Sequence, residues 1–253
     1  MFFGNEHLVK IFKNLAANNE LGQAYLFFGD AQIGKFLFTQ HLAYFLEYNE
    51  WQILPRLLID AQIILPDEKG IIGIDTAIAI RQFLFQKPLR SKRRLAVINE
   101  AAQLTPEAQA SLLKIVEEPP TQALLIFIIQ EPSLLLPPLL SRLTKVYFSR
   151  LSQKTIEEIL QKHYHLNESR VQKIAEKSFG RIGRALALLS ETENQTGNLS
   201  QEVEEKILFF WENKFKNYKI LKELLERNSL IKRYNLNENL QRKAIEYLLK
   251  KSP

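Results

Sequence analysis

A glycine-rich segment that ends in lysine holds the residues most directly suited to chemistry. Residues 29–36 read Gly29-Asp30-Ala31-Gln32-Ile33-Gly34-Lys35-Phe36, which matches the pattern G-x-x-x-x-G-K of a phosphate-binding loop. The glycines let backbone N–H groups curl around phosphate oxygens, and Lys35 neutralises their charge. The pattern normally continues with Ser or Thr, whose hydroxyl binds Mg²⁺, but Phe36 stands here. The segment therefore predicts a phosphate cradle that has lost a metal ligand.

A second pair of residues bears on the same metal ion. Enzymes that hydrolyse nucleoside triphosphates with such a loop hold Mg²⁺ with an Asp at the end of a later strand, and in many families the next Glu polarises water. Here the pair is Asn99-Glu100. Asn carries no charge and attracts a divalent cation weakly. We therefore expect no metal site, and a solvated loop position for Glu100, with catalysis by Glu100 as the alternative.

The apolar pattern predicts strands that alternate with helices up to residue 150. Strands are expected at residues 25–28, 57–65, 95–98 and 124–129, and helices at 6–18, 35–48, 74–85 and 106–118. This alternation is typical of an α/β domain with a parallel sheet. Ligands of such sheets bind at the carboxyl ends of the strands, where Gly29 and Asn99 both lie.

The chain after Arg150 has a different character. Helices are expected at residues 154–164, 167–177, 181–190 and within 201–250, and no strand is expected among them. Residues 191–200 are polar and contain Gly197, so we interpret them as a linker. The expected domains are residues 1–150, 151–192 and 198–253.

Composition limits the classes of function. The chain has 253 residues, 46% of them hydrophobic, no Cys and a formal net charge of +6. Without Cys there is no disulfide framework or thiolate metal site, and the four His show no ligand spacing. No secretory leader or long apolar span is evident, so a cytoplasmic location without a membrane is expected. The densest basic stretch, residues 87–94, is expected to be a solvated turn.

Two longer stretches resemble a known family. Residues 93–120 read RRLAVINEAAQLTPEAQASLLKIVEEPP, and residues 132–142 read PSLLLPPLLSR. Both closely resemble bacterial clamp-loader subunits, and within them the delta-prime type of the DNA polymerase III clamp loader; the resemblance covers about residues 4–190. It implies an α/β P-loop (AAA+-like) domain, followed by a small helical lid domain and a short helical collar tail.

The resemblance assigns roles to individual residues. Ser141-Arg142 matches the family's Ser-Arg-Cys motif, with Leu143 in place of Cys, so Arg142 would be an arginine finger for ATP held by a neighbouring subunit. A local ion pair is the alternative for Arg142. Arg184 falls at the family's sensor-2 arginine. Gly29, Gly34, Lys35, Asn99, Glu100 and Arg184 would then form a degenerate nucleotide site with no productive cofactor, weak nucleotide binding being left open.

The resemblance also implies partners and function. The partners would be ATPase-type and delta-type clamp-loader subunits, and within the assembly the sliding clamp and primed DNA. No zinc is expected, because residues 49–58 lack the four-Cys module of many relatives. The leading hypothesis is a non-hydrolysing subunit that helps load the clamp. The alternatives are an active ATPase of the same fold and a stand-alone nucleic-acid-binding module.

Overall fold

The computed structural model of the chain describes residues 2–164 and 166–195. The chain divides into two compact units, Met1–Leu186 and Ala187–Pro253. The tail expected at residues 198–253 lies outside the described residues, so the collar remains a prediction, and so does the division at residues 150 and 192. No helix within residues 2–164 and 166–195 combines the length and the apolar composition that a membrane span needs.

The first unit is built on a five-stranded sheet in which every pair of neighbours is parallel. The strand order is β2-β3-β4-β1-β5. The strands are β1 (Ala24–Phe28), β2 (Ala61–Ile64), β3 (Arg94–Ile98), β4 (Ala123–Ile128) and β5 (Thr144–Tyr147). The predicted parallel α/β sheet is confirmed.

Two of the strands differ from the sequence prediction. β5 was not predicted, because this edge strand is mostly exposed and its sequence, TKVY, has no apolar run. β2 is shorter than the predicted 57–65, because the backbone N–H groups of Ile59 and Asp60 donate to the Glu47 carboxylate instead of continuing a strand ladder.

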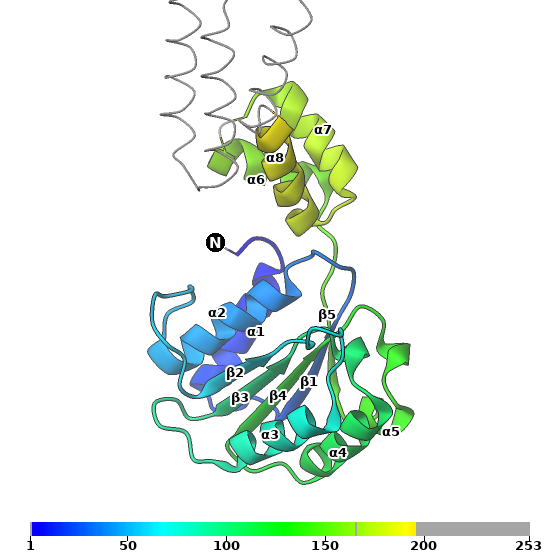
Figure 1. Cartoon of the computed structure of the whole chain (residues 1–253). Helices are drawn as coiled ribbons and strands as arrows, with labels where there is room; N and C mark the ends of the chain where they lie inside the picture. The colour runs from blue at the N-terminus through cyan, green and yellow to red at the C-terminus, as the bar shows by residue number, and fades with distance from the viewer. Residues whose placement is uncertain (1, 165, 196–253) are drawn as a thin grey trace, which may run out of the picture. The chain divides into compact units, whose positions relative to one another are not determined.

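Helices cover both faces of the sheet (Figure 1). On one face lie α1 (Glu6–Ala17) and α2 (Lys35–Tyr48), and on the other α3 (Ile74–Phe85), α4 (Pro106–Glu117) and the short α5 (Pro137–Leu140). Beneath α1 and α2, the rings of Phe12, Phe27 and Phe38 meet edge to face at centroid distances of 5.3–5.6 Å. The opposite face has its own apolar cluster, which includes Ile80, Leu84 and Leu112. Each face of the sheet therefore has a separate core that holds the strand ends in place.

The start of α4 follows the sequence prediction closely. The hydroxyl of Thr105 accepts a hydrogen bond from the backbone N–H of Ala108 at 3.2 Å, and Pro106 is the first helical residue. A hydroxyl cap satisfies a donor that the helix leaves free, and Pro at the first position has no N–H to satisfy.

Up to residue 195, where the described part of the chain ends, three helices follow the sheet: α6 (Gln153–Tyr164), α7 (Glu168–Ser178) and α8 (Ile182–Gln195). The first two bury apolar side chains, among them Leu160 and Val171. The predicted linker at 191–200 is wrong for residues 191–195, because α8 continues to Gln195. Polar residues such as Glu and Gln are good helix formers, and no Gly or Pro interrupts the sequence before Gly197.

Candidate functional site

The glycine-rich segment forms the turn between β1 and α2, as predicted. Gly29 has φ +131°, and a Cβ there would lie 2.5 Å from the carbonyl oxygen of Phe148. Gly34 has φ +98° and is the N-cap of α2. Both positions therefore require glycine, because L side chains rarely adopt such angles. The order strand, glycine loop, helix is the context that a phosphate-binding loop needs.

Lys35 is turned back onto this loop. Its side chain is buried, with the residue 6% exposed, and Nζ donates to the carbonyl oxygens of Gly29 at 2.7 Å and Asp30 at 2.5 Å. Burial lowers the pKa of the Lys35 ammonium to about 8, only partly opposed by the charge of Asp30. The group is thus still mostly protonated at neutral pH, and a phosphate that reached it would compete with two carbonyl oxygens.

The Asp30 side chain has a partner of its own. The guanidinium Nε of Arg150 donates to its carboxylate, and this bond lowers the pKa of Asp30. Both side chains are more than a third exposed, so the pair lies at the surface. This pair joins the loop to the chain segment that follows β5.

A pocket of about 630 Å³ opens beside the loop and brings four predicted site residues together. Gly34 and Lys35 line it from the loop, and Asn99 and Glu100 from the end of β3. Among the described lining residues, Lys35 is the one base, and the two acids are Glu100 and Glu131. The side chain of Glu100 is exposed, as expected for a loop residue. The pocket therefore has little positive charge to offer a polyphosphate.

Phe36 occupies the position where the pattern has a metal-binding hydroxyl. Its ring lines the pocket and packs, partly buried, against the apolar cluster beneath α1 and α2. A hydrocarbon ring at this position supplies no ligand oxygen. Across residues 2–164 and 166–195, no group of three His, Asp or Glu side chains could hold a metal ion.

Arg184 is not among the residues that line the pocket, although its two preceding neighbours are. Ile182 and Gly183 line the pocket, whereas the guanidinium of Arg184 lies over the ring of Phe179, 5.2 Å from its centre. The backbone N–H of Gly183 donates to the carbonyl oxygen of Gln32 at 2.7 Å, and a Cβ at Gly183 would meet that oxygen at 2.7 Å. The start of α8 therefore meets the loop through backbone at a glycine. The sensor-2 role of Arg184 stays a prediction.

Ser141 and Arg142 follow α5 and are not among the residues that line the pocket. Arg142 Nη2 lies 2.8 Å from Glu117 Oε1, and Nη1 donates to the Pro138 carbonyl oxygen at 2.7 Å. This is the local ion pair weighed above as the alternative. Arg142 lies two residues before β5, at the amino ends of the parallel strands, whereas the pocket lies at their carboxyl ends. The role of Arg142 as a finger is untested.

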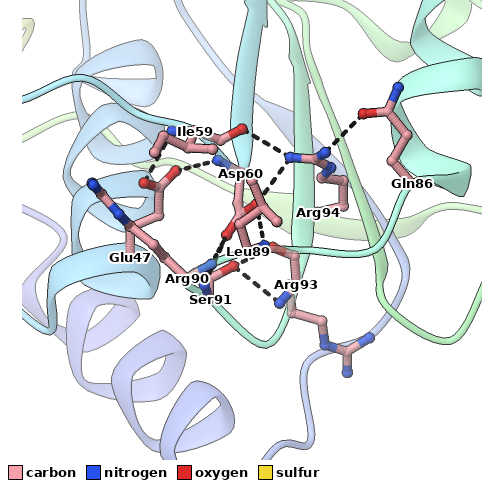
Figure 2. A network of polar contacts seen from close by, with 9 residues as sticks. All are labelled: Glu47, Ile59, Asp60, Gln86, Leu89, Arg90, Ser91, Arg93 and Arg94. Carbon is pink, nitrogen blue, oxygen red and sulfur yellow. Dashed lines mark hydrogen bonds and ion pairs between the residues drawn. The ribbon is translucent and has the colours of Figure 1, made fainter.

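The basic stretch 87–94 is only partly the solvated turn that was expected. Arg93 and Arg94 are buried, and Arg93 donates to the carbonyl oxygens of Leu21 and Thr121 at 2.7 and 2.8 Å. Arg94 pairs with the buried Asp60 at 2.9 Å (Figure 2). The expectation is wrong for these two residues, because the fold surrounds them with acceptors distant in sequence.

Two aromatic residues of the site were missed. Phe2 and Phe3 line the pocket, and the Phe2 ring lies 5.6 Å from that of Phe38. Phe3 lies 4.9 Å from the ring of His163 in α6. The sequence contains one indication of them, two adjacent aromatic residues before Gly4, but these belong to no periodic pattern that would predict a helix or strand.

Residues 4–152 match the family model described as "DNA polymerase III, delta subunit". Subunit gamma/tau of DNA polymerase III from Mycoplasma pneumoniae is 24% identical over 208 residues, which are 76% of this chain and 30% of that protein. Subunit delta' from Bacillus subtilis is 32% identical over 101 residues, which are 40% of this chain and 30% of that protein. The chain thus spans about a third of the length of these relatives.

A solved structure supports the same fold. The Holliday junction branch migration motor RuvB from Thermotoga maritima superimposes with a TM-score of 0.57 at 18% identity, over 76% of this chain and 63% of that one. At this identity the likeness shows the α/β fold alone. Because the family model covers more than half of the chain, the protein belongs to the DNA polymerase III delta subunit family of clamp-loader subunits.

Proposed function

We propose that the chain is a delta-prime-type subunit of the DNA polymerase III clamp loader that does not hydrolyse ATP itself. It supplies Arg142 as an arginine finger to ATP held by a neighbouring ATPase-type subunit, and so helps the assembly load a sliding clamp onto primed DNA. The single observation that carries the proposal is the partly buried ring of Phe36 at the position of the metal-binding hydroxyl.

The electrostatics of the pocket support the first half of the proposal. Hydrolysis by P-loop proteins depends on Mg²⁺, which bridges the β- and γ-phosphates and neutralises developing charge. Phe36 and Asn99 remove both protein ligands that normally hold this ion. Lys35 would face a triphosphate against two lining acids, Glu100 and Glu131.

The surroundings of Arg142 support the second half. Its side chain is 40% exposed and its partner Glu117 44% exposed, so their ion pair contributes at most about 1 kcal/mol. A triphosphate bound to a neighbouring subunit carries more negative charge than one carboxylate. It would therefore compete with Glu117 for the guanidinium of Arg142. An arginine finger supplied in trans accelerates phosphoryl transfer by roughly 10³–10⁵-fold in well-studied cases.

The test is the ATPase rate of a loader reconstituted with the full chain and its ATPase-type partner. Arg142→Ala is expected to lower the rate at least about tenfold, and Arg142→Lys to restore little, because Lys lacks the planar fork of donors. Glu117→Gln is the matched control: it removes the local partner but keeps Arg142, so the rate stays equal or rises. An unchanged rate with Arg142→Ala would rule out the finger.

A second candidate is an active ATPase, favoured by the pocket itself, since about 630 Å³ beside a retained Lys35 is ample for a nucleotide. In that case metal would be held by water or other ligands, with Glu100 as the base. Calorimetric titration of the isolated chain with Mg-ATP separates the candidates. Tight binding and turnover that both vanish with Lys35→Ala would establish the second and overturn the first.

A further inference from the structure

Two loops meet at Tyr48, the last residue of α2, and form a surface that none of the roles above uses. Tyr48 Oη donates to the Leu57 carbonyl oxygen at 2.7 Å, and Arg90 donates to the same Tyr48 oxygen. The guanidiniums of Arg56 and Arg90 both lie over the Tyr48 ring, each 5.4 Å from its centre. We name this surface, made of Tyr48, Arg56, Leu57, Leu89 and Arg90, the Tyr48 patch.

The patch exposes two leucines beside its two arginines. Leu57 is 86% exposed and Leu89 is 75% exposed, which makes them the two most exposed large apolar side chains among the described residues. Single exposed leucines are ordinary on a protein surface. Here two of them flank arginines that meet at one tyrosine, and Tyr and Arg are the residue types enriched in binding hot spots.

The buried carboxylate of Asp60, at the end of the first loop, binds the backbone of the second loop (Figure 2). Asp60 is 1% exposed and accepts backbone N–H groups from Leu89, Arg90 and Ser91 at 2.8, 2.6 and 2.8 Å. Its ion pair with Arg94 ties the loops to the start of β3. A surface fixed in this way loses little conformational entropy when a partner binds.

We propose that the Tyr48 patch is a docking site for an acidic segment of another protein that carries apolar side chains. The exposed Lys87 and Lys92 add positive charge beside the two arginines. The two acids nearest Tyr48 in sequence both have local donors: Glu47 accepts from the N–H groups of Ile59 and Asp60, and Glu50 accepts from Gln52, so the four cations outnumber them. The net charge of the patch is therefore positive, and acidic groups complement it while apolar groups cover the leucines.

The same geometry argues against a nucleic acid as the occupant. Single-stranded nucleic acids bind by stacking bases on free aromatic faces. The Tyr48 ring already has two guanidiniums over it, and the Tyr44 ring stacks on it at 6.1 Å. Exposed leucines contribute nothing to phosphate binding. A protein segment uses both the charge and the apolar surface of the patch.

The patch lies away from the pocket. Asp60 and Arg94 mark the amino ends of β2 and β3, whereas Asn99 and the pocket follow the carboxyl end of β3. Binding at the patch is thus independent of whether the chain holds a nucleotide, and its test is separable from that of the proposed function.

The test uses the full chain and a short fluorescein-labelled peptide in which aspartates alternate with leucines. Fluorescence anisotropy is expected to detect saturable binding that weakens at least about tenfold with Leu57→Ala/Leu89→Ala, and likewise with Arg56→Ala/Arg90→Ala. Leu65→Ala/Lys145→Ala removes one exposed leucine and one exposed cation elsewhere, and is expected to change nothing. Peptides with Asn for Asp, or Ala for Leu, are expected to bind at least about tenfold more weakly.

A charge exchange guards against variants that merely unfold. Arg56→Glu/Arg90→Glu is expected to lose the acidic peptide and gain a peptide in which lysines alternate with leucines. The proposal is overturned if no peptide binds, or if the control pair weakens binding as much as the patch pairs. It is also overturned if oligothymidylate competes at the patch more strongly than the peptide, or if Leu57→Ala/Leu89→Ala abolishes self-association instead.

Discussion

Replacing Asp60 with Asn is expected to destabilise the sheet domain by about 3–5 kcal/mol. The buried carboxylate accepts Leu89 N–H and Arg94 Nη1 through Oδ1, and Arg90 and Ser91 N–H through Oδ2. An amide NH₂ must replace one of these oxygens, so two donors lose their acceptor in either orientation. Each lost bond to a charged acceptor is worth about 1.5–3 kcal/mol, and the buried Arg94 loses its counter-charge.

The measurement is urea unfolding of the full chain, followed by circular dichroism. The matched control is Asp67→Asn, since Asp67 also accepts two backbone N–H groups, from Lys69 and Ile71, but at the exposed surface. The control is expected to lose no more than about 1 kcal/mol. A loss of less than about 1 kcal/mol for Asp60→Asn would show that the loops find other acceptors and would refute the reasoning.

The pH dependence of the stability of wild type and Asp60→Asn is a second test. Burial by itself raises the pKa of Asp60, but the three backbone donors and Arg94 outweigh it and hold the pKa below its ordinary value. A depressed folded-state pKa stabilises the fold above the unfolded pKa, and this contribution is lost as pH falls through the folded pKa. The stability difference between wild type and Asp60→Asn is therefore expected to shrink on acidification below about pH 4.

Two further predictions concern the pocket. The pKa of Lys35 is about 8 in the folded chain, against an ordinary value of 10.5. Between these two pH values the unfolded chain therefore holds a proton that the folded chain has released, so the folded state becomes more stable as pH rises. Measured by urea unfolding, the free energy of unfolding of wild type is expected to rise by up to about 3 kcal/mol relative to Lys35→Met between pH 8 and pH 10.5. Phe36→Ser combined with Asn99→Asp restores both metal ligands, so the isolated variant is expected to bind Mg-ATP more tightly than wild type in calorimetry, and to lose that gain when EDTA removes the metal. Equal affinity for both proteins would show that these two positions do not limit metal binding.

The loop and the helices were predictable because their signals are local. Gly29 and Gly34 are spaced as a phosphate cradle requires, and both adopt the positive φ that glycine permits. The bounds predicted for α2 and α3 match the structure, since their apolar spacing lies within a single element.

The contacts that cross the fold were not predictable in the same way. Arg94 reads as part of a basic run, and only the pairing of β2 with β3 brings it to Asp60. The strand β5 has no apolar run, because an edge strand pairs on one side and needs little burial to stay in place. For Arg142 the sequence left an ion pair and a finger open. Its contact with Glu117 explains the resting position without deciding between them.

The direction of the parallel strands separates Arg142 from the chain's own pocket. The phosphate loop follows the carboxyl end of β1, whereas Arg142 precedes the amino end of β5, its immediate neighbour in the sheet. A strand of four or five residues spans roughly 13–17 Å, so Arg142 lies beyond reach of a phosphate cradled at Lys35. An arginine so placed can serve only a nucleotide bound outside its own pocket. The residues at positions 36 and 99 therefore do not affect the position of Arg142, and the proposed finger does not depend on a working pocket in this chain.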